Sequence, residues 1–420
     1  MTAIVGILNK RGVAIAADSA VTVGNGDNVK IYNTSQKIFK LSEKNPLALM
    51  IYDAASFMGI PWDVIIDMYR NERGERTFDK VQDYANDFLK FLGDFDFVKS
   101  EEDQRDYLIR EMCTVYDKLV TAIKARAEDD IKLIENPTDE DAERIYLMHS
   151  ENVHKEFADL CNEAGKADGL SDYTYQRFCK QIAEPLEFVM TEVLEVNWEE
   201  AEKEQWQQAF FYYLTSKFFY NQTGLVFIGF GSKDIYPSSY SAFVSGVFNG
   251  CLRWLEDDKE EITNRHSSLI LPYAQTDVMM TMMKGVAPAF YNQILESQKS
   301  SLEKAKEKIV TKLSELGISN DVIEQVTNLE TEDIQKSYEE EIGAFMDENY
   351  IQGVVNAVDS FNLEDMANMA ESLISITNLQ RHFSSSEESV GGPIEVAIIT
   401  RGSGFKWVKH RRILGSHVRE

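Results

Sequence analysis

The first seventeen residues restrict the fold more than any other stretch of this sequence. An apolar run at residues 4–8 and a second at residues 13–17 flank the polar turn Asn9-Lys10-Arg11-Gly12. Two short apolar runs around a Gly-containing turn predict a β-hairpin, and the unbroken apolar character predicts that both strands are buried. These residues therefore predict a β-sheet core that strands from later in the sequence complete.

Strand-like and helical segments alternate along the rest of the sequence. The predicted strands cover residues 37–41, 47–52, 224–231, 239–248, 268–273, 394–400 and 405–409. Apolar residues at spacings of three and four predict helices over most of 78–220, and further helices over about 56–70, from Thr276, over 287–316 and over 363–379. The segment Glu256–Thr263 is polar and falls outside the predicted strands, and Pro185 predicts a helix boundary.

One α+β core with helical insertions accounts for this order, because strands occur at the start, in the middle and at the end. We assign the core to residues 1–70, 221–286 and 351–420. The helical insertions are residues 71–220 and 287–350.

Composition excludes several classes of partner. Acidic residues outnumber basic ones 70 to 43, for a net charge of -27, so nucleic acid is excluded as a general partner and an anionic membrane is disfavoured. No apolar run approaches the roughly 18–20 residues of a membrane span, and no secretory signal is recognisable. We therefore expect a cytoplasmic protein.

Metal and disulfide chemistry is not indicated either. The four cysteines are scattered without CxxC spacing and the six histidines do not cluster. This pattern predicts reduced, buried thiols, and we predict no metal site and no cofactor.

Thr2 is the residue with the clearest chemical potential. If Met1 is removed, which requires a small second side chain, Thr2 combines a nucleophilic Oγ with its own α-amine, a base with an ordinary pKa of about 8. An alcohol also needs a nearby positive charge to favour its ionised form, and a buried lysine held by a carboxylate supplies one. Asp18 and Lys37 are the candidates.

The segments Thr2–Gly6, Gly12–Ser19 and Gln36–Leu41 carry a resemblance to a known family. They look like the β-type subunits of the proteasome and their bacterial relative HslV, which are N-terminal nucleophile (Ntn) hydrolases. The interval from Thr2 to Asp18 is the one this family uses. Thr22 matches a loop threonine whose backbone pairs with substrate, and Lys37 lies slightly later than in the family.

The resemblance implies a fold and further site residues. The fold would be a four-layer αββα sandwich with two antiparallel sheets face to face. The outer helices would begin near residues 56, 276 and 363. The family's oxyanion-hole glycine falls within Asp53-Ala54-Ala55, so an amide there would take its role. Glu387 and Ser389 align with residues that support the terminal amine. The two insertions have no counterpart in a standard subunit.

Three functions stay open at this point. The first is a threonine-type amide hydrolase, a proteasome-like peptidase with peptide or protein substrates. The second is a catalytically inactive structural or scaffold subunit. The third is an Ntn amidase for a small non-peptide amide, with a pocket closed by residues 71–220. The resemblance also implies a homo-oligomer, either a ring or a dimer, and leaves an unfoldase partner open.

Overall fold

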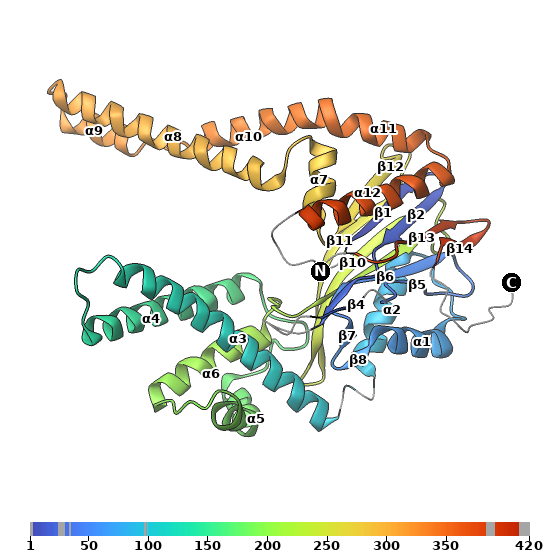
Figure 1. Cartoon of the computed structure of the whole chain (residues 1–420), viewed down its shortest axis with the longest axis horizontal. Coiled ribbons are helices and arrows are strands. Elements are labelled where there is room, and N and C mark those ends of the chain that lie inside the picture. Colours follow the sequence, from blue (N-terminus) through green and yellow to red (C-terminus); the bar gives the residue numbers. More distant parts are fainter. Residues whose placement is uncertain are drawn as a thin grey trace. The chain divides into compact units, whose positions relative to one another are not determined.

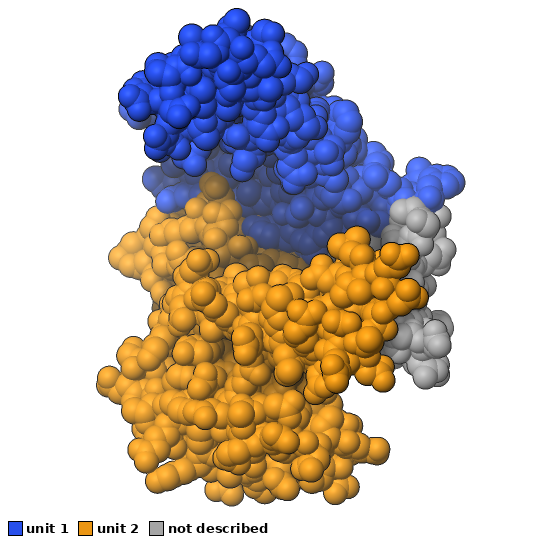
Figure 2. All heavy atoms as spheres, turned by 90° about the vertical axis from the view of Figure 1, so that its left-hand side faces the viewer, with its two compact units in different colours: residues 1–38, 235–238, 261–420 blue, residues 39–234, 239–260 orange. Residues whose placement is uncertain are grey.

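The computed structural model describes residues 3–23, 30–32, 35–95, 98, 100–383 and 391–410. It combines helices with antiparallel sheets, and it divides into two compact units, coloured separately in Figure 2. Unit 1 comprises residues 1–38, 235–238 and 261–420, and unit 2 comprises residues 39–234 and 239–260. Each unit is therefore assembled from segments that are distant in the sequence.

Unit 1 contains a five-stranded sheet in the order β12-β1-β2-β13-β14. Its strands are β1 (Ile4–Asn9), β2 (Gly12–Ala17), β12 (Ser268–Tyr273), β13 (Glu395–Thr400) and β14 (Gly404–Lys409). The predicted N-terminal hairpin is confirmed, the strands predicted over 394–400 and 405–409 pair as a second hairpin, and every residue of β1 and β2 is buried. In the antiparallel pairing of β2 with β13, Ala17 faces Glu395.

Three helices pack on this sheet, namely α7 (Thr276–Lys284), α11 (Gln352–Ser360) and α12 (Leu363–Phe383). Alternate residues of β1, including Val5 and Ile7, pack with Met366 and Ile374 of α12 in one apolar cluster. The amphipathic helices thus cover one face of the sheet, and Figure 1 shows α12 running across β1 and β2.

A helical arm also belongs to unit 1. It consists of α8 (Pro288–Glu315), α9 (Asn320–Thr327), α10 (Glu332–Met346) and the π-helical turn Asp347–Ile351 (Figure 1, orange). No residue of α8 or α9 is buried, and Met346 is the buried residue of α10. Burial of apolar side chains therefore contributes little to the stability of the arm.

Gly12 shows why the turn between β1 and β2 needs a glycine. A Cβ at this position would lie 2.5 Å from the backbone oxygen of Ile399 in β13, closer than real Cβ contacts come. The missing side chain lets the two strand backbones approach each other.

Unit 2 holds the second five-stranded sheet, in the order β11-β10-β9-β6-β5. Its strands are β5 (Ile38–Lys40), β6 (Leu47–Asp53), β9 (Thr223–Gly229), β10 (Ser238–Phe248) and β11 (Cys251–Glu261). The antiparallel pair β6–β9 places Asp53 opposite Thr223 at one end of the sheet. Two short ladders accompany the sheets, β3 (Val21–Val23) with β4 (Lys30–Tyr32) and β7 (Ser56–Phe57) with β8 (Ile60–Pro61).

The helices of unit 2 are mostly those that the apolar periodicity predicts. They are α1 (Trp62–Arg73), α2 (Val81–Asp94), α3 (Glu101–Ile131), α4 (Asp139–Glu163), α5 (Tyr175–Phe188), the π-helical turn Val189–Val193 and α6 (Glu200–Thr215). Buried aromatic rings fill the space between α2 and the sheet, as in the edge-to-face pair of Phe88 and Phe227.

Three local predictions are wrong. The polar segment from Glu256 belongs to β11, an end strand of the sheet, where charged side chains reach solvent. The first helix begins at Trp62 rather than Ser56, because positive φ angles at Met58 (49°) and Gly59 (87°) turn the chain between β7 and β8. Pro185 lies inside α5 instead of ending it.

Among the described residues, no helix is both long and apolar enough to cross a membrane.

Candidate active site

Asp18 joins the beginning of β1 to the end of β2. Residues Ile4 and Ala17 are paired in the hairpin, so Ala3 and Asp18 follow as the next opposing positions. The Asp18 N–H donates to the Ala3 carbonyl oxygen at 3.1 Å, and the Ala3 N–H donates to Asp18 Oδ1 at 2.9 Å. The carboxylate thus fixes the backbone of the residue that follows Thr2 in the sequence.

Lys37, immediately before β5, reaches the same carboxylate oxygen. Its Nζ donates to Asp18 Oδ1 at 2.7 Å and to the Ala20 carbonyl oxygen at 2.6 Å. Lys37 is 3% exposed and Asp18 is 1% exposed, so this ion pair is shielded from water. The sequence prediction that Asp18 and Lys37 act together is consistent with these contacts.

The second carboxylate oxygen of Asp18 is also bonded. It accepts the Ala20 N–H at 3.3 Å and the Gly391 N–H at 3.1 Å. A buried carboxylate with several donors is strongly held, because these hydrogen bonds replace the water that it loses on burial. Two segments of unit 1 that are distant in the sequence, at Ala3 and at Gly391, therefore meet at Asp18.

Burial and charge act in opposite directions on Lys37. Desolvation lowers the pKa of its ammonium from the ordinary value of 10.5, and the Asp18 carboxylate counteracts that shift. Glu395 adds a further raising contribution to the pKa of Lys37. The net effect lowers the pKa of Lys37, because the cost of burying the charge is the largest of these contributions.

Glu395 and Ser19 are site residues that the sequence reasoning missed. Glu395 is 4% exposed, and its Oε1 lies 3.0 Å from His410 Nδ1. The Ser19 hydroxyl donates to the Pro393 carbonyl oxygen at 2.8 Å. A signal existed for Glu395, because it is an acidic residue at the start of the apolar run that forms β13.

The other predicted site residues differ in how far the structure places them. Thr2, Glu387 and Ser389 lie outside the described residues. Thr22 lies in β3, where it pairs with Ile31 of β4. Asp53 and Ala54 lie at the end of β6 in unit 2.

Asp53 adopts the backbone conformation that a glycine would favour. Its φ is 70°, in the left-handed region, where Asp and Asn are the commonest non-glycine residues. The chain therefore makes a turn after β6 of the kind that glycine most often makes, with an aspartate in that position. This turn determines the direction of the Ala54 amide.

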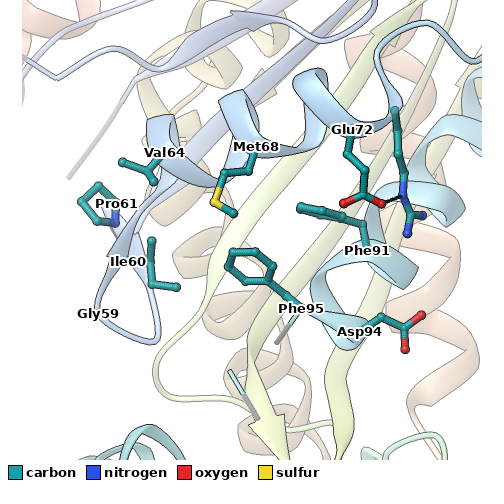
Figure 3. Close-up of a pocket in the computed structure, with 10 residues that line it drawn as sticks. Gly59, Ile60, Pro61, Val64, Met68, Glu72, Phe91, Asp94 and Phe95 are labelled. Atoms are coloured by element: carbon teal, nitrogen blue, oxygen red, sulfur yellow. Dashed lines mark hydrogen bonds and ion pairs between the residues drawn. The ribbon is translucent and has the colours of Figure 1, made fainter. Parts of the chain in front are cut away.

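Two of the cavities within unit 2 differ clearly in size and lining. The larger, of about 810 Å³, lies beside α1 and α2 and is mainly apolar, with Val64, Met68 and Phe95 projecting into it (Figure 3). None of the predicted site residues lines it. The smaller, of about 230 Å³, is lined by Ala54 and by polar side chains of α3, β9 and β10.

Nothing in the described part of the chain forms a metal centre. No group of three or more His, Cys, Asp or Glu side chains there has the arrangement of a metal site.

The comparisons with known proteins give little beyond this geometry. No protein-family model and no curated protein matches the sequence. Two solved structures of Anbu from Hyphomicrobium sp. strain MC1, one of them a Gly-1 mutant, each align over 98% of this chain and 87% of their own. The identities are 9% and 8%, with TM-scores of 0.30 and 0.29. Likeness at this level assigns neither family nor function.

Proposed function

We propose that this protein is a threonine-type Ntn amide hydrolase whose nucleophile is Thr2 after removal of Met1. The observation that carries the proposal is the shared use of Asp18 Oδ1 by the Ala3 N–H and the Lys37 ammonium, at 2.9 and 2.7 Å. One carboxylate holds both the residue bonded to Thr2 and the only lysine predicted to serve it. Such a pair supplies the fixed positive charge that an alcohol nucleophile needs.

The proposed reaction has two halves. The α-amine of Thr2 takes the Oγ proton while Oγ attacks the substrate carbonyl, and the amine then gives that proton to the leaving nitrogen as the C–N bond breaks. The product is an acyl ester on Thr2. The same amine then activates a water molecule, which cleaves the ester, releases the carboxylic acid and restores the hydroxyl.

The surrounding groups have distinct proposed roles. Lys37 stabilises the developing negative charge on Thr2 Oγ, and Asp18 positions Lys37. The Ala54 amide, after the turn at Asp53, donates to the oxyanion of the tetrahedral intermediate. The backbone of Thr22 pairs with the extended substrate, and Glu387 and Ser389 support the terminal amine.

The burial of the ion pair favours catalysis over a scaffold role. Removing two charges from water costs several kcal/mol per ion, and an apolar pair of similar size often replaces a buried ion pair without loss of stability. A purely structural subunit has no need of Lys37 and Asp18 at 3% and 1% exposure. In the proposed enzyme, the buried pair has a function, because it supplies the positive charge that stabilises the nucleophile.

Several further features belong to the same proposal. The core is a four-layer αββα sandwich, for which the complete burial of β1 and β2 is a requirement that the chain meets. The substrates are peptides or proteins, the protein is a cytoplasmic homo-oligomer, and the two helical insertions at 71–220 and 287–350 are additions to the core.

Intact mass measurement with a β-lactone or epoxyketone probe tests the proposal. We expect the native chain to lack Met1 and to gain one probe mass. Thr2→Ala should gain none, and Thr2→Ser, which keeps a hydroxyl, should still react. Retention of Met1 throughout the purified protein, or equal labelling of Thr2→Ala, would contradict the assignment.

A further inference from the structure

The small cavity beside Ala54 has the size and chemistry of a side-chain pocket. Its volume is about 230 Å³, below the roughly 300–1,000 Å³ of sites for whole drug-sized ligands, so it suits one substrate side chain. The end of β6, the helix α3 and the residues around the start of β9 form its wall. Since Ala54 carries the proposed oxyanion amide, a side chain in this cavity would belong to a residue at the scissile bond.

Glu111 of α3 is the buried charged group that lines this cavity. The residue is 1% exposed, its Oε2 accepts the Tyr213 hydroxyl at 2.5 Å, and its Oε1 accepts the Asn221 amide at 3.1 Å. Across the ranges that the structure describes, no Lys, Arg or His nitrogen forms an ion pair with it. A carboxylate offers about four lone-pair directions, so Glu111 keeps capacity for a donor from a ligand.

Arg253 is a fully buried cation, and the Glu111 carboxylate contributes to raising the pKa of its guanidinium, so the two charges interact. Its Nη1 donates to the Tyr107 hydroxyl at 2.7 Å and its Nη2 donates to the Tyr213 carbonyl oxygen at 2.6 Å. Arg253 does not line the cavity, whereas Glu111 does. The buried charge on the wall of the cavity is therefore that of Glu111.

Arg110 also lines the cavity, but it is exposed. Interactions of exposed charges are weakened by water several-fold relative to buried ones. The buried carboxylate of Glu111 therefore outweighs the exposed guanidinium of Arg110 in selecting what enters.

We infer that this cavity is a specificity pocket for a positively charged side chain, lysine or arginine, of a peptide substrate. The inference rests on the proposed hydrolase function and names its substrate class. It also gives the helical insertion a role, because α3 supplies Glu111.

The test compares the hydrolysis rates of coumarin amides of three amino acids that are acetylated on the α-nitrogen: lysine with a free side-chain ammonium, norleucine and glutamate. We expect kcat/KM for the lysine amide to exceed that for the norleucine amide by about tenfold or more, as for a charged hydrogen bond. Glu111→Gln should remove this preference, and Glu102→Gln, on the exposed part of α3, should keep it. Preference for norleucine or glutamate, or a preference unchanged in Glu111→Gln, would overturn the pocket assignment while leaving the hydrolase intact.

A variant at another residue tests the pocket even if Glu111→Gln fails to fold. Ser56 is exposed and lines the cavity without joining the buried network. Ser56→Lys should place a tethered ammonium there and suppress the lysine preference, whereas Ser56→Gln should not. Equal preferences in these two variants would count against the pocket.

A binding measurement separates this inference from the proposed function. The Thr2→Ala variant cannot hydrolyse substrate and allows binding to be measured by calorimetry. In this variant we expect Nα-acetyl-lysine methylamide, with its free side-chain ammonium, to bind more tightly than Nα-acetyl-norleucine methylamide. Glu111→Gln in that background should abolish the difference. That result supports the pocket even if no amide is hydrolysed, and equal binding of the two compounds rejects it even if hydrolysis occurs.

Discussion

At the scale of single residues, Asp18 is the most heavily used group of the candidate site. It binds Ala3, Lys37, Ala20 and Gly391 through hydrogen bonds of 2.7–3.3 Å. Because Lys37 is almost completely buried, the Asp18 carboxylate is what stabilises its charge. The stability of the site therefore depends mainly on the Asp18 side chain.

Asp18→Asn should destabilise the protein strongly, by about 3–5 kcal/mol, because it leaves the Lys37 charge buried without a counter-ion. The double variant Asp18→Asn/Lys37→Met should be more stable than Asp18→Asn alone, since it removes that charge. Urea unfolding followed by circular dichroism measures both. Additive losses in the double variant would show that the two residues do not interact.

The pH dependence of hydrolysis should reveal Lys37. Burial lowers its pKa below 10.5, so its proton is lost as pH rises through that lowered value and the charge that stabilises Thr2 Oγ disappears. We expect the alkaline limb of kcat/KM below pH 10.5. In Lys37→Arg the limb should move upward, because a guanidinium stays protonated. An unchanged alkaline limb in an active Lys37→Arg variant would assign the limb to another group.

At the scale of helices and strands, patterns in the sequence predict interior elements better than edges. Buried strands such as β1, β2 and β9 are continuous apolar runs and are predicted within a few residues. The whole of β11 was missed, and its second half is charged because an end strand needs no apolar pattern. Asp18 and Lys37 could be predicted because they follow or precede such runs. Ser19 could not, because its partner Pro393 is recognisable only after folding.

The helix α4 carries a buried histidine that should make stability depend on pH. His154 Nδ1 bonds to the Ser150 carbonyl oxygen, and Nε2 is buried with no partner among the described residues. Burial lowers the pKa of His154 below 6.5. The unfolded chain therefore binds a proton before the folded one, and stability should fall as pH drops from 6.5 through the lowered pKa.

Urea unfolding at pH 8 and pH 5 measures this effect. His154→Gln should lose less stability between the two pH values than the wild type, while the exposed His266→Gln should follow the wild type. An equal loss in His154→Gln would show that His154 is not the source.

The helical arm and the sheet of unit 1 should differ in local stability. The helices α8 and α9 bury no residue, whereas β1 and β2 are buried throughout. Amides in elements with few buried contacts exchange through low-energy local opening. Hydrogen exchange followed by mass spectrometry should show α8 and α9 exchanging well before β1 and β2. Equal protection would mean that a partner covers the arm in solution.

At the scale of the whole molecule, the acidic charge and the helical arm bear on assembly. A net charge of -27 keeps chains apart unless apolar contacts outweigh the repulsion. The arm exposes large apolar side chains, including Phe290 and Phe345 at 61% and 57%. Exposed apolar groups of this kind commonly mark interaction surfaces.

Mass photometry should therefore detect a homo-oligomer that becomes more abundant as salt screens the charge. Replacing Phe290 and Phe345 together by Ser should shift the population towards single chains. Replacing Ile235, an exposed residue outside the arm, by Ser should not. A single-chain mass for the wild type at every salt concentration would contradict the proposed oligomer.

The hydrogen bond from Gly391 to Asp18 spans 373 residues, which has a consequence for protein synthesis. At about 5–20 residues per second, the ribosome needs roughly 20–75 s to deliver Gly391 after Asp18 has emerged. Throughout that interval β2 lacks its neighbour β13, and its open edge is available to other nascent chains on the same messenger. Slower translation or a shortage of chaperones should therefore lower the yield of soluble protein before any effect on the finished fold is visible.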